Sequence, residues 1–180
     1  DGRHVSMGFA RGLMTQKMQE LGKADTSGTK VKFWADEEIF TETTSYQYEI
    51  LQTRLRELAF LNKGIRIELA DERSENGKHD EFFYEGGIVS FIEYLNENKS
   101  ALHAPVYLDK AKDGIELEVV LQYTEAYSEN VFSFVNNINT HEGGTHLSGF
   151  KTALTRSFNQ YADKNGLLKG GAKLSSDDVR

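Results

Sequence analysis

Residues 48–69, YEILQTRLRELAFLNKGIRIEL, combine two kinds of hydrophobic periodicity. The first part carries apolar side chains at helical spacing, namely Tyr48, Leu51, Leu55, Leu58 and Ala59. Lys63 and Gly64 predict that this helix ends near Asn62, because glycine adopts the backbone that closes a helix. Beyond the glycine, Ile65, Ile67 and Leu69 alternate with charged residues, which is typical of a strand. A helix followed so closely by a strand favours the α+β class.

Upstream of this segment the patterns are weaker. Residues 4–10 have the composition of a strand, whereas residues 11–27 are polar, contain two methionines and show no steady period, so we expect a flexible loop there. Residues 30–34 alternate, with Val31 and Phe33 on one face, which predicts a strand. Thr44 and Gln47 have the spacing of a capping box, which predicts that the helix begins beside Thr44.

Downstream, the sequence predicts a second group of elements. Asn76 and Gly77 favour a hairpin turn into a strand over residues 81–84, and Gly86 with Gly87 predicts a domain boundary. We therefore expect one domain over residues 1–86 and another over residues 87–180. The second should contain a helix over residues 88–95, strands over 106–108 and 115–123, and a strand over 131–137 that pairs with 115–123.

A long helix should follow, with Thr145 as its N-cap and Gly166 at its end. Its apolar stripe consists of Leu147, Phe150, Leu154, Phe158 and Tyr161. Arg156 lies opposite this stripe, so its side chain should face away from the core.

Composition excludes several functions. The 180 residues contain no cysteine, which excludes a disulfide framework, a thiol nucleophile and a thiolate metal site. No apolar stretch is long enough for a transmembrane helix. The net charge of -7 argues against a protein that coats nucleic acid, although it leaves room for a local basic patch.

Few residues offer chemistry of their own. None of the five histidines has the spacing of a zinc-hydrolase motif, and a metal site at His141 and His146 is disfavoured. Gly143 and Gly144 before a helix could cradle a phosphate, but no Lys–Ser/Thr pair follows as in a P-loop, and a simple helix start explains them as well. We expect no catalytic or metal-binding residue, and Lys151 and Arg156 alone would be ordinary solubilising charges.

Several motifs nevertheless occur in a specific order, and together they resemble the ATPase subunits of the type IIA DNA topoisomerases, the family of bacterial DNA gyrase B. The motifs are TSGTKVKFWAD at residues 26–36, RLRELAFLN at 54–62, YEGG at 84–87, FIEYLN at 91–96 and GGTHLSGF at 143–150. The resemblance covers nearly all of the chain from Gly28 onward. The B subunit of topoisomerase IV shares this layout, but the RLRELAFLN motif looks closer to gyrase.

The resemblance implies a fold and an activity. Residues 1–86 would be the tail of a GHKL ATPase α/β sandwich, and residues 87–180 an incomplete transducer domain, with a mainly antiparallel sheet and a long helix of left-handed βαβ type. The family couples ATP hydrolysis, with Mg²⁺, to DNA duplex passage and negative supercoiling. Its general base, its Mg²⁺-binding Asn and its phosphate lid would precede Asp1, and its γ-phosphate Lys would follow Arg180. We therefore expect a fragment that is inactive alone and binds neither ATP nor Mg²⁺ tightly.

The resemblance also implies roles for four residues. Thr29 matches a threonine on the adenine side of the ATP pocket, and Val31 matches a residue that lines it, although Val31 is equally an inward strand residue. Arg156, and Lys151 after it, would face DNA. The implied partners are the gyrase A protein, DNA and, on ATP binding, a second copy of gyrase B, in the cytoplasm and away from membranes. The alternatives are the B subunit of topoisomerase IV and a stand-alone α+β binding module without an ATP role.

Overall fold

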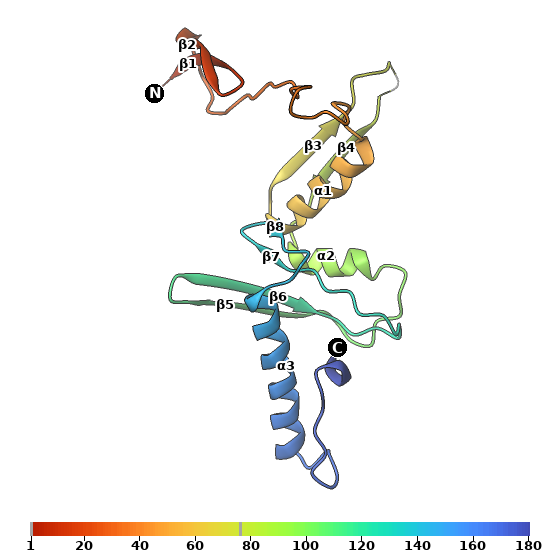
Figure 1. Cartoon of the computed structure of the whole chain (residues 1–180). Coiled ribbons are helices and arrows are strands. Elements are labelled where there is room, and N and C mark those ends of the chain that lie inside the picture. The colour runs from red at the N-terminus through yellow and green to blue at the C-terminus, as the bar shows by residue number, and fades with distance from the viewer. Residues whose placement is uncertain (1, 76) are drawn as a thin grey trace. The chain divides into compact units, whose positions relative to one another are not determined.

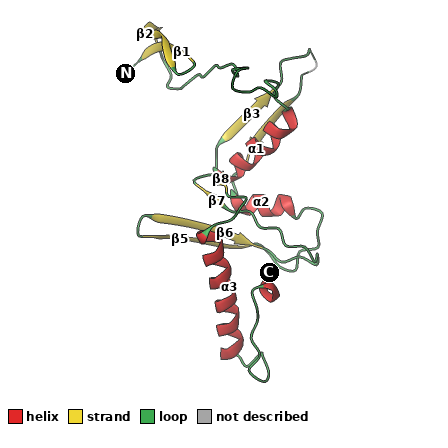
Figure 2. Ribbon diagram, viewed as in Figure 1, coloured by secondary structure: helices red, strands yellow, loops and turns green. Residues whose placement is uncertain are grey.

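The structure, a computed structural model, describes residues 2–75 and 77–180 (Figure 1). The chain forms two compact units, Asp1–Gln47 and Tyr48–Arg180. The described residues form helices and two-stranded antiparallel sheets, which confirms the predicted α+β class (Figure 2).

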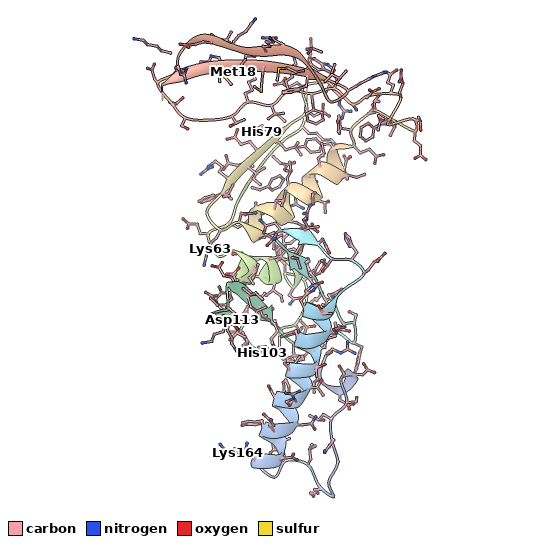
Figure 3. The ribbon with its side chains drawn as sticks, turned by 60° about the vertical axis from the view of Figure 1, so that its left-hand side comes forward. Met18, Lys63, His79, His103, Asp113 and Lys164 are labelled. Carbon is pink, nitrogen blue, oxygen red and sulfur yellow. The ribbon has the colours of Figure 1, made fainter. Side chains whose placement is uncertain are left out.

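The first unit contains a hairpin of β1 (Arg3–Ala10) and β2 (Leu13–Lys23). Its turn, Arg11 and Gly12, has two positive φ angles of 49° and 78°, as a two-residue hairpin turn requires. The prediction of a flexible loop over residues 11–27 is therefore wrong. Every side chain of β2 is exposed, including Met18 (Figure 3). Because neither face of the strand is buried, the sequence of β2 does not alternate between apolar and polar residues.

The rest of this unit has no regular strand, and the strand predicted over residues 30–34 is wrong. Val31 and Phe33 alternate as expected but are 76% and 68% exposed. A strand needs a partner for its backbone N–H and C=O groups, and no described residue pairs with this segment. After this segment, the chain is held to the β1–β2 turn by the Arg11 guanidinium, which forms ion pairs at 2.7 Å with both Asp36 and Glu38.

The second unit begins with α1 (Tyr48–Leu61), which lies against β3 (Arg66–Ala70) and β4 (His79–Phe83). The prediction of a capping box at Thr44 is wrong, because α1 starts directly after Gln47, which lies three residues beyond Thr44. The antiparallel pairing of β3 with β4 confirms the predicted hairpin. Its expected turn falls partly on Asn76, which lies outside the described residues.

Polar contacts hold the start of α1 to β4. The Tyr48 hydroxyl donates to Asp80 Oδ2 at 2.6 Å, and Gln52 Nε2 donates to the same oxygen at 2.8 Å. These two bonds lower the pKa of the Asp80 carboxyl. Burial, together with the nearby carboxylate, raises the pKa of Tyr48 to about 12. The contact therefore favours a charged Asp80 beside a neutral phenol.

An aromatic cluster joins α1 to α2 (Ile88–Leu95), a helix predicted with the correct bounds. Phe60 is 1% exposed, and its ring stacks on Tyr84 with a centroid separation of 3.6 Å. It also lies near Phe91 and Tyr94 of α2, and Phe91 contacts Phe132. One apolar core thus extends across Gly86 and Gly87, while the division into domains at this point stays a prediction.

The next strands pair locally. β5 (Val106–Lys112) and β6 (Ile115–Leu121) form a hairpin through Asp113 (labelled in Figure 3) and Gly114. A strand over residues 131–137 that pairs with β6 is wrong, because β5 holds that place and β7 (Phe134–Val135) pairs with β8 (Ile138–Asn139). Asn136 and Asn137 have φ angles of 48° and 66°, so they turn the chain within two residues.

The long helix α3 (Thr145–Lys164) ends as expected, with Gly166 at a φ of 61°. Its N-cap is Gly144 rather than the predicted Thr145. Leu147, Phe150 and Leu154 are half-buried, whereas Tyr161 is 64% exposed. The chain then returns along the helix to the 3-10 turn η1 (Asp177–Val179), so the buried face of α3 turns toward that segment (Figure 1).

Candidate functional site

Thr29 and Val31, predicted on the adenine side of an ATP pocket, both lie in the irregular part of the first unit. Both side chains are exposed, and neither belongs to the small pocket that Phe60, Gly86 and Gly87 line in the second unit. In residues 2–75 and 77–180, no three His, Asp or Glu side chains are grouped closely enough to hold a metal ion.

The two predicted DNA-facing residues differ sharply in their surroundings. Arg156 is exposed on α3, and no described side chain or carbonyl forms a hydrogen bond or ion pair with it. Lys151 is only 27% exposed, and its Nζ lies 3.5 Å from Glu129 Oε1. Five residues of a helix turn by about 140°, so the two side chains leave α3 in different directions.

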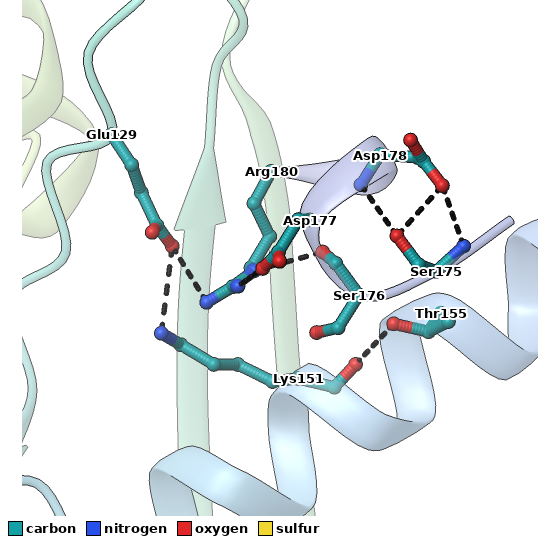
Figure 4. A network of polar contacts seen from close by, with 8 residues as sticks. All are labelled: Glu129, Lys151, Thr155, Ser175, Ser176, Asp177, Asp178 and Arg180. Carbon is teal, nitrogen blue, oxygen red and sulfur yellow. Dashed lines mark hydrogen bonds and ion pairs between the residues drawn. The ribbon is translucent and has the colours of Figure 1, made fainter.

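Glu129 also forms an ion pair with Arg180, whose Nη1 lies 3.4 Å from the same Oε1 (Figure 4). One carboxylate thus serves two cations, one from α3 and one from the C-terminal segment. Lys151 therefore has its charge partly neutralised within the unit, while the charge of Arg156 remains available to a partner. The sequence ranked Arg156 ahead of Lys151 by its place opposite the apolar stripe, but it could not predict the ion pair of Lys151, because Glu129 lies in a loop without periodicity.

The C-terminal segment is fixed by contacts that the sequence analysis missed. Asn159 donates from Nδ2 to the Leu174 carbonyl at 2.9 Å and accepts from the Leu174 N–H at 2.8 Å. Val179 is 4% exposed, and its carbonyl accepts from the Tyr123 hydroxyl at 2.8 Å. These contacts attach the segment to both α3 and the end of the β5–β6 hairpin.

Within this segment, the N–H and the hydroxyl of Ser175 each donate to Asp178 Oδ2 at 2.7 Å (Figure 4). The Asp178 N–H donates in return to Ser175 Oγ at 3.3 Å. The hydrogen bonds from Ser175 lower the pKa of Asp178. The signal was present in the sequence, because a serine followed three residues later by an acidic residue has the spacing of a capping box.

A second contact missed from the sequence joins α1 to the β7–β8 turn. Arg54 Nη2 donates to the Asn137 carbonyl at 2.6 Å, and Asn137 Nδ2 donates to Asn62 Oδ1 at 2.9 Å. Residues that are 83 and 75 positions apart in sequence thereby meet. The left-handed backbone of Asn137 turns both its carbonyl and its amide toward α1.

A family model described as DNA gyrase B matches residues 87–180. The chain belongs to the DNA gyrase B family. It is 51% identical over 174 residues to the DNA gyrase B protein of Halalkalibacterium halodurans, covering 96% of this chain and 27% of that protein. It is 48% identical over 182 residues to the DNA gyrase B protein of Staphylococcus epidermidis, covering 100% of this chain and 28% of that protein. The chain therefore spans little more than a quarter of the length of these relatives.

Solved structures extend the likeness from sequence to fold. The crystal structure of the 43K ATPase domain of Thermus thermophilus gyrase B, in complex with an aminocoumarin, matches with a TM-score of 0.75 and 33% identity. The match covers 99% of this chain and 49% of that one. The gyrase B protein of Myxococcus xanthus matches with a TM-score of 0.75 at 26% identity, over 91% of this chain and 48% of that one.

The part of the chain that the structure describes has no helix with the length and apolar content to cross a membrane.

Proposed function

We propose that this chain is the part of a gyrase B protein that joins the end of its ATPase domain to its transducer domain. The complete protein would hydrolyse ATP to drive DNA duplex passage and negative supercoiling. The observation that carries this proposal is 51% identity across 96% of the chain to a protein named as the B subunit of DNA gyrase. This identity favours gyrase over topoisomerase IV and over a stand-alone binding module.

Residues 1–86 would belong to the GHKL ATPase domain and residues 87–180 to the transducer. The start of the family match at Gly87 supports this division. Thr29 and Val31 would lie on the adenine side of a nucleotide pocket that other parts of the longer protein complete. We therefore expect calorimetry on this chain to detect no tight ATP binding, and tight binding would refute this assignment.

DNA would contact the exposed side of α3, chiefly through Arg156 and secondarily through Lys151. The guanidinium of Arg156, which is exposed and has no partner among the described residues, supports this proposal, because a phosphate can bind it without displacing an internal partner. The gyrase A protein, DNA and, on ATP binding, a second copy of gyrase B would be the partners, in the cytoplasm. A few such side chains suffice for local DNA contact despite the net charge of -7.

Arg156→Gln in the complete gyrase B protein, combined with gyrase A, tests this function. We expect lower DNA-stimulated ATP hydrolysis and supercoiling with unchanged hydrolysis in the absence of DNA. Loss of one phosphate contact should also reduce the salt slope of DNA binding by roughly one unit. Lys151→Gln should have a smaller effect, because Glu129 already pairs with that ammonium.

Arg156→Lys is the matched control, because it keeps the charge and should keep most of the stimulation. Unchanged DNA stimulation and salt dependence in Arg156→Gln would refute the DNA-facing role of Arg156. An unmodified gyrase B protein without any DNA-stimulated ATP hydrolysis would refute the proposed function as a whole.

A further inference from the structure

Asn137 is held to α1 at two points. Its carbonyl accepts from Arg54 Nη2 at 2.6 Å, and its side-chain amide donates to Asn62 Oδ1 at 2.9 Å. Two bonds in different directions fix both the distance and the orientation of the turn on the helix, which a single contact would leave free to rotate.

The two side chains that hold Asn137, Arg54 in α1 and Asn62 directly after it, are themselves oriented by contacts with α1. Arg54 Nη1 donates to Glu57 Oε2 at 2.8 Å, and Asn62 Nδ2 donates to the Leu58 carbonyl at 2.7 Å. Each therefore presents a defined atom to the turn and loses little side-chain entropy when Asn137 docks.

The other end of the turn leads to α3. Directly after β8, Thr140 bonds to Ser133 through both its N–H, at 2.8 Å, and its hydroxyl, at 2.9 Å to the Ser133 carbonyl. Thr140 Oγ1 also lies 3.1 Å from His146 Nε2 in the first turn of α3. Polar contacts at Asn137 and at Thr140, joined by the short strand β8, thus link the end of α1 to the start of α3.

We propose that Asn137 is a positioning residue that sets the orientation of α3 relative to α1 and thereby couples ATP hydrolysis to DNA contact. This inference rests on the proposed function, in which α1 belongs to the ATPase domain and α3 carries the DNA-facing side chain. The stripe of α3 remains partly exposed, so polar contacts carry much of the constraint on the helix. Loss of one such contact should therefore change the orientation of α3 before it unfolds the unit.

The neighbouring Asn136 provides a matched control. Both residues have left-handed backbones, with φ angles of 48° and 66°, and glycine adopts this conformation without strain. Among the described residues, none forms a hydrogen bond with the Asn136 side chain, whereas Asn62 accepts one from Asn137. Asn137→Gly therefore removes the amide contact, and Asn136→Gly makes the same backbone change without removing any.

The first test measures position directly. The chain has no cysteine, so Thr53→Cys on α1 and Ser157→Cys on α3 allow specific spin labelling at two exposed sites. We expect Asn137→Gly to shift or broaden the distance distribution between the labels, and Asn136→Gly to leave it unchanged. An identical distribution in both variants would overturn the proposal.

The second test uses the complete gyrase B protein combined with gyrase A and DNA. We expect Asn137→Gly to keep DNA-independent ATP hydrolysis and to lose roughly 2- to 30-fold of its DNA stimulation, the usual range for residues that carry coupling. Asn136→Gly should retain full stimulation. Unchanged stimulation in Asn137→Gly, equal losses in both variants, or an equal loss with and without DNA would each overturn the positioning role. An unmodified protein without DNA stimulation would instead refute the proposed function.

Discussion

Phe60→Ala tests whether residues 48–180 share one apolar core. The ring is 1% exposed and lies between Tyr84 and the α2 residues Phe91 and Tyr94. Truncation of a buried phenylalanine to alanine costs about 3–5 kcal/mol, because transfer free energy and packing around the new cavity are both lost. Each aromatic pair contributes roughly 0.5–1.5 kcal/mol beyond burial, so we expect a loss near the upper end of that range.

Urea unfolding followed by far-UV circular dichroism measures this loss, and the melting temperature should fall by roughly 10–20 °C. Ile50→Ala is the control on the same helix, because Ile50 is 62% exposed and its loss should change stability by about 0.5 kcal/mol or less. Phe60→Leu, expected to cost roughly 1–2 kcal/mol, gives a measurable value if the alanine variant is unfolded at the outset.

The pattern of unfolding is as informative as its midpoint. A shared core predicts that hydrogen exchange becomes faster in both α1 and α2 when Phe60 is truncated, since one cooperative unit contains them. A second transition that Phe60→Ala leaves in place, or an equal loss in Phe60→Ala and Ile50→Ala, would refute the shared core. Independent domains that meet at Gly86 and Gly87 would then explain the data.

Two further predictions concern the polar contacts of the second unit. Asp80 has a lowered pKa, so its contribution to stability is complete above about pH 4 and is lost as the pH falls through the folded-state pKa. Tyr48 has a pKa raised to about 12, so its contribution is complete below about pH 10 and is lost as the pH rises toward 12. Urea unfolding midpoints measured across this pH range should show both losses of stability. Asp80→Asn should weaken the pH dependence at the acidic end, and Tyr48→Phe should weaken it at the alkaline end. An unaltered pH dependence in these variants would contradict the role of the Tyr48–Asp80 contact. Asn159→Ala should speed tryptic cleavage after Lys173, because it frees the Leu174 backbone, and a rate equal to that of Gln160→Ala would contradict this.

Elements with their own boundary signals could be predicted from the sequence. The stop at Gly64, the bounds of α2 and the end of α3 at Gly166 all depend on residues in the element or within a few positions of its end. The starts of helices were less predictable. Thr44 and Thr145 both have suitable side chains, yet Gln47 directly precedes α1 and Gly144 caps α3. Backbone geometry before the helix decides the first residue, and a side-chain pattern alone does not encode it.

Whether a segment forms a strand depends on a partner strand, and the predictions of strands were therefore the least accurate. β2 has no alternation because both of its faces are exposed, and its pairing with β1 follows from the tight turn at Arg11 and Gly12. Residues 30–34 alternate but have no partner strand among the described residues, so alternation alone did not produce a strand. Asn136 and Asn137 turn the chain, so Phe134 and Val135 pair with the residues just beyond this turn. The predicted strand over residues 131–137 ignored this turn and placed its partner too far away in the sequence.

The candidate site shows the same division between local and tertiary information. Helical spacing was sufficient to predict that Arg156 is exposed, because its direction depends only on α3. Lys151 lies on the same helix, but its availability depends on Glu129, which comes from another segment and also pairs with Arg180. The proposed capacity to bind DNA therefore follows neither from the net charge nor from the count of basic residues on α3. It follows from which cations the fold leaves without an internal carboxylate, and a comparison of Arg156→Gln with Lys151→Gln measures that difference directly.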